Sequence, residues 1–210
     1  MNHLLKEACV ETFDEALAAE RNGANRIELC SRLDLGGLTP SKALAARILK
    51  FLNIPAKVMI RPREGNFYYN KPEIIQMCKD IRDFNSMGIS GVVFGVLKVD
   101  GAIDIAAVNL ITKVAKNLDF TFHKAIDKTG NIINQLKILI QKTEICAILS
   151  SGGSSNALLG STVLKNMIKV SNNKVAIICA GSITFKNISK VHTLINGHEY
   201  HGRNIIDLSK

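Results

Sequence analysis

Two glutamate-x-cysteine pairs, Glu7 with Cys9 and Glu28 with Cys30, carry the side chains of this chain that are best suited to chemistry. They lie in "LLKEACV" and "NRIELC", two short segments of strand-like composition. Thiolates favour soft ions such as Cu(I), whereas carboxylates and histidines such as His123 suit harder cations or acid–base catalysis. If the two segments form neighbouring strands and both cysteines point to the same side of the sheet, both sulfurs will lie close enough to bind one soft ion.

The segments that must position these residues recur along the chain as strand-like runs separated by helix-like runs. In helix-like segments such as "TFDEALAAERNGA", apolar residues recur at three- and four-residue steps. Helix starts are predicted at Thr12, with Glu15 completing a capping box, and at Ser41, Asp104 and Thr184. We predict eight strands, at residues 4–10, 25–30, 56–63, 91–97, 120–127, 146–153, 175–182 and 197–202.

The alternation of strands and helices predicts the fold class. Parallel strands need helical crossovers, and eight such units without a linker favour one α/β domain over residues 1–210, a (β/α)8 TIM-type barrel. An open doubly wound sheet is the alternative architecture. Only "RNIIDLSK" follows the last predicted strand, so we expect the eighth helix to be short or missing.

A barrel explains why the segment at residues 25–30 alternates apolar and polar side chains. One face of each barrel strand points toward the helices, and the other face points into the barrel. We therefore expect Ile27 and Leu29 to face the helices, while both glutamate-x-cysteine pairs face inward. They lie near the C-terminal ends of their strands, which is where the active sites of TIM barrels are found.

Further polar side chains at strand ends converge on the same mouth of the barrel. Arg61 and Lys124 are the expected partners of the inward glutamates, because an unpaired buried carboxylate is costly. His201 also lies at a strand end, but a lone buried histidine is more often structural. The candidate catalytic residues are Glu7, Glu28, Arg61, His123 and Lys124.

Glycine-rich turns after the sixth and seventh predicted strands, "SSGGSS" and "CAGSIT", form a candidate anion site. Backbone N–H groups of such turns commonly hold phosphate in TIM barrels, although glycines also serve tight turns without a ligand. The candidate ligand-binding residues are Arg63, Ser151, Gly152, Gly153 and Gly181.

The composition argues against several classes of protein. The net charge is +9, but the lysines fall singly and are not interleaved with aromatic residues, so nucleic acid is not an expected partner. The apolar runs are far too short to cross a bilayer, and Glu7 and Glu11 interrupt any signal peptide, so we expect a cytoplasmic protein without a membrane partner. Five cysteines without a CxxC pair disfavour a disulfide framework or a structural zinc site.

Several motifs in order resemble those of the copper homeostasis protein CutC family, over nearly the whole chain. They are "EACVET", "GANRIELCSRLDLGGLTPS", "VMIRPREGNFYY", "GISGVVFGVLKVDGAID", "TFHKAID", "ILSSGG" and "EYHG". The resemblance implies a cytoplasmic, usually oligomeric TIM-type barrel that acts in copper tolerance and binds Cu(I), with Cys9 and Cys30 as the metal ligands. The chain departs from the family pattern at Lys124, where arginine is usual, and at Ser182, where a third glycine is usual; both changes weaken the case for anion binding.

Two functions from different classes stay open. The first is a copper-handling protein that binds a copper ion, Cu(I), through Cys9 and Cys30. The second is a TIM-barrel enzyme that acts on a small anionic metabolite, with acid–base roles for Glu28 and His123 and charge stabilisation by Arg61. We also expect a homodimer or higher homo-oligomer, because a missing eighth helix would leave apolar surface beside the eighth and first strands.

Overall fold

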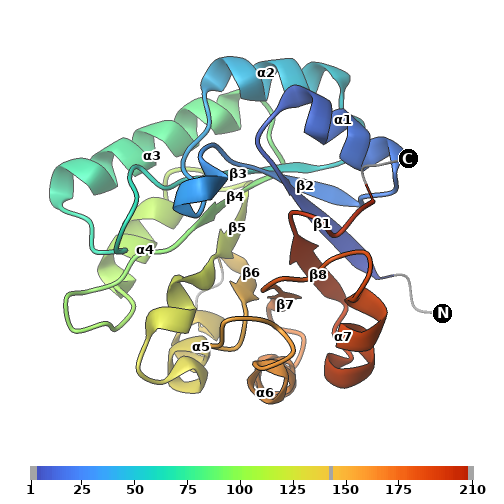
Figure 1. Cartoon of the computed structure of the whole chain (residues 1–210). Helices are drawn as coiled ribbons and strands as arrows, with labels where there is room; N and C mark the ends of the chain where they lie inside the picture. Colours follow the sequence, from blue (N-terminus) through green and yellow to red (C-terminus); the bar gives the residue numbers. More distant parts are fainter. Residues whose placement is uncertain (1–3, 142–143, 208–210) are drawn as a thin grey trace.

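Eight parallel strands in chain order form a closed barrel in the computed structural model, which describes residues 4–141 and 144–207 (Figure 1). Each strand pairs with the next, and the last pairs with the first. The predicted (β/α)8 fold is therefore confirmed, and the open sheet is excluded. The strands are β1 (Leu5–Val10), β2 (Arg26–Leu29), β3 (Ala56–Met59), β4 (Gly91–Phe94), β5 (Asp119–Phe122), β6 (Ile145–Ser150), β7 (Ala176–Cys179) and β8 (Glu199–Gly202).

Helices connect the strands and surround the barrel (Figure 1). They are α1 (Phe13–Arg21), α2 (Lys42–Phe51), α3 (Lys71–Ser86), α4 (Ile105–Thr112), α5 (Ile132–Ile140), α6 (Ser161–Ser171) and α7 (Ile188–Ile195), with short 3-10 helices η1 (Leu33–Leu35) and η2 (Lys124–Lys128). As far as residue 207 no helix follows β8, as predicted. Among the described helices, none has the length and apolar character needed to span a membrane.

Three of the four predicted helix starts are confirmed by their capping contacts. Thr12 caps α1 within a full capping box, and the side chains of Ser41 and Asp104 cap α2 and α4. The prediction for Thr184 was wrong, because α7 begins after Asn187, whose side chain instead accepts a hydrogen bond from the Thr184 N–H.

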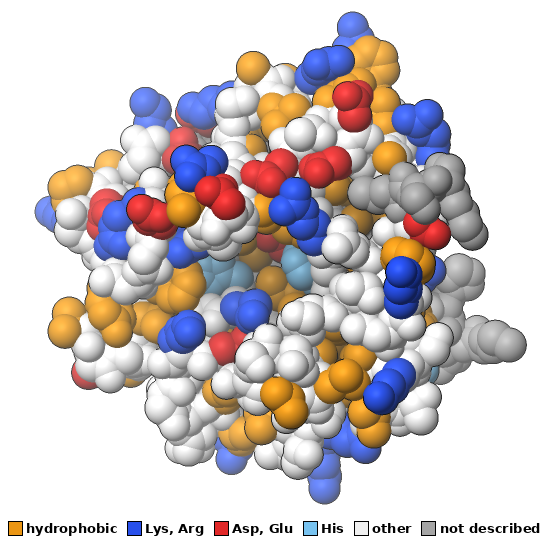
Figure 2. All heavy atoms as spheres, in the orientation of Figure 1, with side chains coloured by type: hydrophobic (Ala, Val, Ile, Leu, Met, Phe, Trp, Pro, Cys, Tyr) orange, Lys and Arg blue, Asp and Glu red, His pale blue; other side chains and the backbone are white. Residues whose placement is uncertain are grey.

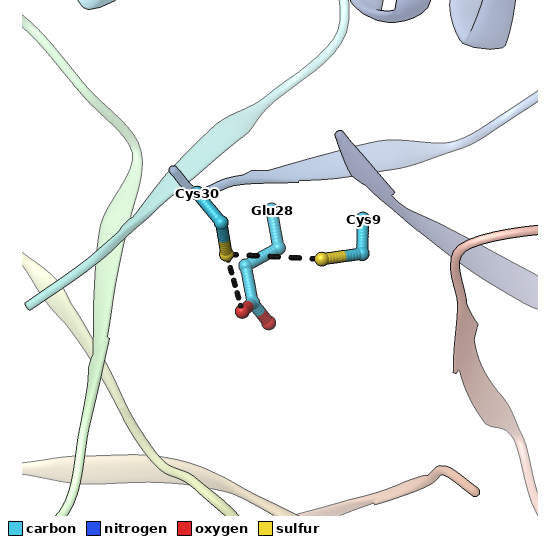
Figure 3. A group of neighbouring side chains, drawn as sticks. All are labelled: Cys9, Glu28 and Cys30. Carbon is cyan, nitrogen blue, oxygen red and sulfur yellow. Dashed lines mark hydrogen bonds between the residues drawn. The ribbon is translucent and has the colours of Figure 1, made fainter. Parts of the chain in front are cut away.

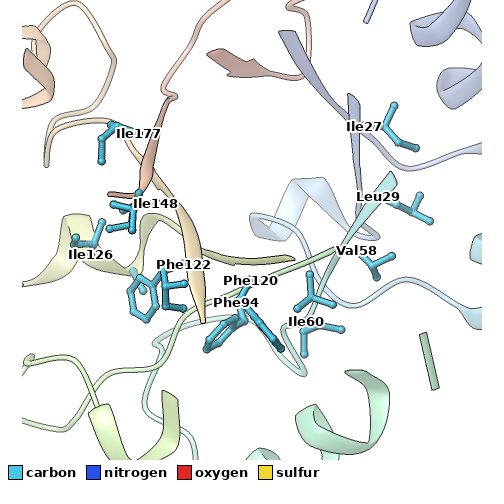
Figure 4. Close-up of a cluster of buried hydrophobic side chains, with 14 of the residues drawn as sticks. Ile27, Leu29, Val58, Ile60, Phe94, Phe120, Phe122, Ile126, Ile148 and Ile177 are labelled. Carbon is cyan, nitrogen blue, oxygen red and sulfur yellow. The ribbon is translucent and has the colours of Figure 1, made fainter. Parts of the chain in front are cut away.

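The main core lies between the strands and the helices, and Ile27 and Leu29 face it as predicted (Figure 4). The barrel interior is packed separately. Cys9, Cys30, Met59 and Val93 form one small interior cluster, and Ala147, Leu149, Ile178 and Ala180 form another.

The apolar surface that we expected beside β8 and β1 is not exposed. The outward side chains Ala8 and Val10 are each 2% exposed, and Tyr200 is fully buried. Ile205 and Ile206, which follow β8, are also buried and join the same core. The reason given for self-association was therefore wrong, and the homo-oligomer stays a prediction without this support.

Candidate functional site

A pocket of about 430 Å³ opens at the C-terminal end of the barrel. Figure 2 shows this face with histidine side chains inside a central hollow and lysine and arginine side chains around it. The strand ends of both halves of the barrel contribute to its wall. The residues predicted from the sequence that line it are Cys9, Glu28, Cys30, Arg61, His123, Lys124 and Gly181.

Cys9 and Cys30 meet at the floor of this pocket (Figure 3). Cys9 of β1 pairs in register with Glu28 of β2, and Cys30 follows two residues later on the same face. The two Sγ atoms lie 3.7 Å apart, and the Sγ of Cys30 lies 3.3 Å from Oε1 of Glu28. The three side chains thus offer ligand atoms that all lie within 4.8 Å of one another. Matching parity on adjacent strands is what brings the sulfurs together.

The two thiols differ in acidity because they share one hydrogen bond. The bond between the two thiols lowers the pKa of Cys9 to about 6, against the opposing effect of burial, and His201 acts in the same direction as the bond. The same bond, together with burial and nearby negative charge, raises the pKa of Cys30 well above its ordinary value. Of the two thiols, Cys9 is therefore the one that ionises more readily, and the thiolate is the nucleophilic and metal-binding form of cysteine.

Glu7 lies behind the sulfurs as an ionised carboxylate and is fully buried. It forms an ion pair with Arg26 and accepts a hydrogen bond of 2.9 Å from Nδ1 of His201. Arg26 is also paired with Glu199, at 2.8 Å. Burial opposes the charge on Glu7, but the bond from His201 and the charge of Arg26 lower its pKa to about 2. The partners predicted for the glutamates, Arg61 and Lys124, were therefore wrong for Glu7.

Glu28 has the opposite protonation state, although it is also buried. Burial raises its pKa to about 8, with the charge of His201 opposing the shift. Its Oε2 has no hydrogen-bond partner among the described residues, and Nδ1 of His201 lies 3.5 Å away. Burial also opposes a charge on His201, yet Glu28, Cys9 and Glu7 together raise its pKa well above the usual range. Burial thus favours the neutral acid at Glu28, whereas the acidic groups around His201 favour its imidazolium.

Arg61 binds backbone instead of a glutamate. Its Nη1 donates to the carbonyls of Leu35, Gly36 and Gly37, each at 3.1 Å, and its Nη2 donates to that of Gly65 at 3.0 Å. These contacts tie together the loops that follow β2 and β3. The side chain is 6% exposed, and its Nε has no partner within the described residues.

His123 is a neutral donor at the end of β5. Its Nδ1 accepts a hydrogen bond of 3.1 Å from the Ala125 N–H, which assigns the ring proton to Nε2. Burial and the charge of Arg61 lower its pKa to about 3. The ring lies against Gly95, where an added Cβ would come within 2.3 Å of Nδ1. Its Nε2 has no partner in the described part of the chain.

The remaining predicted residues fall into two groups. Lys124 begins η2 and lines the pocket beside His123. Arg63 does not line it: the side chain pairs with Glu73 at 2.6 Å and donates to the Tyr68 carbonyl at 2.6 Å. Arg63 therefore supports the loop after β3, and its prediction as a ligand-binding residue is not supported.

The glycine turn after β6 already holds an anion, which is the carboxylate of Asp127. Asp127 accepts hydrogen bonds from the N–H groups of Ser151 at 2.8 Å and Gly153 at 3.0 Å. The Gly152 N–H donates to the Ser150 hydroxyl at 2.9 Å. These three N–H groups are therefore engaged by the protein itself, contrary to the predicted anion cradle. Gly181 alone of the predicted glycines lines the pocket.

Arg26 and His201 are among the residues of this site that sequence reasoning did not assign to it. Arg26 was not predicted at all, and His201 was interpreted as structural. Arg26 has the same parity as Glu28 and Cys30 in "NRIELC", so the alternation already indicated an inward side chain. His201 could have been found in the same way, because Glu199 and His201 alternate with Tyr200 and Gly202.

Known proteins resemble this chain over almost its full length. The family model described as CutC family matches residues 4–206. The copper homeostasis protein cutC homolog of Homo sapiens is 36% identical over 95% of this chain and 73% of its own length. The family protein CutC of Treponema denticola is 36% identical over 96% and 81%.

Solved structures agree with the sequence comparisons. A crystal structure named for the copper homeostasis protein CutC of Streptococcus agalactiae has a TM-score of 0.91 and 27% identity, covering 96% of this chain and 99% of that one. Dihydrodipicolinate synthase DapA-2 of Bacillus anthracis, with a TM-score of 0.68 and 11% identity over 96% and 70% of the chains, shares the fold alone. The match over residues 4–206 and the identity to full-length relatives show that this chain belongs to the CutC family.

Proposed function

We propose that this protein binds one Cu(I) ion between Cys9 and Cys30, as a copper homeostasis protein. The observation that carries the proposal is the distance of 3.7 Å between the two sulfurs at the pocket floor. With metal–sulfur bonds of about 2.3 Å, one ion can contact both sulfurs. Thiolate is a soft ligand, so the pair favours Cu(I) over hard cations.

Two further features support a site for a monovalent cation. The pKa of Cys9 is lowered to about 6, which favours its thiolate, the form of cysteine that binds metal. The sulfurs also line an open pocket, which gives an ion a route to them. The names of the human and streptococcal relatives refer to copper homeostasis, in agreement with this proposal.

Competition against a Cu(I) chelator tests the proposal, with Cys146→Ser as the background because Cys146 is an exposed thiol. In this background we expect one tightly bound Cu(I) per chain. The double variant Cys9→Ser with Cys30→Ser should lose this tightly bound ion. Cys179→Ser removes a buried thiol of the main core between the strands and the helices, and this variant should keep the ion. Equal affinity in the double variant would contradict the proposal.

A second candidate function is acid–base catalysis on a small anionic metabolite. The observation that favours it is that two buried glutamates have different partners: Glu7 is paired with Arg26 and His201, whereas Oε2 of Glu28 has no hydrogen-bond partner among the described residues. These surroundings lower the pKa of Glu7 to about 2 and raise that of Glu28 to about 8. Such a pair can hold a proton donor beside an anion at neutral pH. Incubation with small carbonyl acids in D₂O tests it by NMR: we expect deuterium uptake next to the carbonyl with the parent and not with Glu28→Gln. No uptake with the parent would contradict this candidate.

A further inference from the structure

We propose that Arg61 and His123 form a subsite that binds the carboxylate group of a small organic acid. This subsite lies on the part of the pocket wall formed by the ends of β3 and β5. This inference names the class of ligand for the second candidate function, and any catalytic role of the subsite rests on that function. Binding of the carboxylate can be measured separately, without turnover. It is independent of copper binding at the sulfurs.

Two unpartnered donors carry the inference. Nε of Arg61 and Nε2 of His123 each have no hydrogen-bond partner among residues 4–141 and 144–207, and both side chains are at least nine-tenths buried. Both residues line the pocket. A buried N–H group without a partner is costly, and both of these groups belong to residues that line one cavity, so we assign them to a ligand bound there.

The two donors belong to one local arrangement. The guanidinium of Arg61 lies 5.0 Å from the ring centre of Phe67, and the ring of His123 lies 4.8 Å from the same ring. Phe67 also lines the pocket and thus fixes both side chains from one side. Backbone groups hold the remaining nitrogen atoms of both side chains. Carbonyls accept from Nη1 and Nη2 of Arg61, and the Ala125 N–H donates to Nδ1 of His123. The donors are therefore preorganised.

The charge of Arg61 selects an anion. Its guanidinium donates to four backbone carbonyls and also interacts with the Tyr69 hydroxyl, which leaves its positive charge without a carboxylate partner in the described chain. An uncompensated buried charge is unfavourable, and an anion in the pocket would relieve it. His123 adds a donor without adding a positive charge, so a ligand with a single negative charge is enough for the subsite.

The number and surroundings of the donors favour a carboxylate over a phosphate. Two N–H groups and one positive charge match two oxygens and one negative charge. A phosphate would require more donors than this subsite offers, and the turn N–H groups of Ser151 and Gly153 are already bound to Asp127. Lys124 and Arg203 also line the pocket, so phosphate is the competing ligand in the test below. The side chains of Leu33 and Leu149 line the same pocket and can contact the carbon skeleton of an organic acid.

Calorimetry with pyruvate, malonate and inorganic phosphate at matched ionic strength tests the subsite. We expect at least one of the two carboxylates to bind more tightly than phosphate. His123→Asn keeps an acceptor for the Ala125 N–H but has no N–H donor at the position of Nε2. It should therefore weaken carboxylate binding by roughly tenfold or more. His123→Gln can place an amide N–H near the Nε2 position and should retain more of the affinity.

Controls separate the subsite from general charge and from the sulfurs. Lys124→Ala removes a positive charge at the pocket without touching either donor, so it should weaken binding less than His123→Asn does. Cys9→Ser with Cys30→Ser should bind carboxylate like the parent. The proposal is overturned if phosphate binds best, if neither carboxylate binds, or if His123→Asn folds normally by circular dichroism and binds like the parent.

Discussion

Replacing Glu28 by glutamine should stabilise the protein, and the gain should grow as the pH rises. Glu28 is 2% exposed, and its pKa in the folded chain is about 8 against an ordinary value of 4.5. A raised carboxyl pKa means that folding favours the neutral acid. The associated stability is fully present below pH 4.5 and is lost as the pH rises toward 8. Glutamine has nearly the same shape, stays neutral, and therefore avoids this loss.

The magnitude follows from the two pKa values of Glu28. A tenfold change in proton affinity corresponds to about 1.4 kcal/mol, so the change from 4.5 to about 8 corresponds to at most roughly 5 kcal/mol at pH 8.5. The imidazolium of His201, 3.5 Å from Oε2, can stabilise the carboxylate once it forms. We therefore expect Glu28→Gln to gain at least about 2 kcal/mol at pH 8.5 and less than about 1 kcal/mol at pH 5.

Urea denaturation at pH 5 and pH 8.5 measures this difference, with Glu7→Gln as the matched control. The pKa of Glu7 is lowered to about 2, so its charge stabilises the fold above pH 4.5, and this contribution is lost as the pH falls toward 2. Glu7→Gln should therefore lose roughly 3 kcal/mol at neutral pH. If Glu28→Gln is less stable than the parent at pH 8.5, or its advantage does not depend on pH, our reasoning about the buried acid is wrong.

Other predictions concern the supports of the site and the assembly. Gly95→Ala should displace His123, because the new Cβ would meet Nδ1 at 2.3 Å, and should cost about 1–3 kcal/mol in chemical denaturation; an unchanged stability would refute the packing argument. Asp127→Asn should cost about 1–3 kcal/mol by the same assay, because an amide cannot accept all the N–H and hydroxyl donors of the turn; no loss would refute this. Light scattering should show an oligomer, and a stable mass near 22.9 kDa would contradict it.

The fold and the inward cysteines could be predicted because both depend on local periodicity. Alternation in "NRIELC" decides which face of β2 is inward, and neighbouring strands then place the sulfurs of Cys9 and Cys30 together. The partners of the glutamates depend instead on the register between strands. That register sets Arg26 opposite Glu7 and His201 beside it from β8, which no single segment of sequence reveals.

The loops were harder to predict because their contacts span long sequence separations. Arg61 was expected to neutralise a glutamate, but the loop after β2 folds over it and presents three carbonyls to Nη1. The glycine turn after β6 was expected to bind an external anion, but the carboxylate of Asp127 accepts its N–H groups. In both cases groups within the protein occupy the donors that the sequence had assigned to other partners.

These contacts separate the two parts of the pocket chemically. Around the sulfurs, Glu7 and Glu199 are paired with Arg26 and His201, and buried Lys57 adds a further positive charge near Glu7. Thiolates are soft ligands, and this softness, more than any excess of negative charge, would suit the two sulfurs to Cu(I). Around Arg61 the neighbours are carbonyl dipoles, so its positive charge has no carboxylate partner among the described residues and suits an anion. If both proposals hold, Cu(I) and a carboxylate should bind the same pocket without competing for the same atoms.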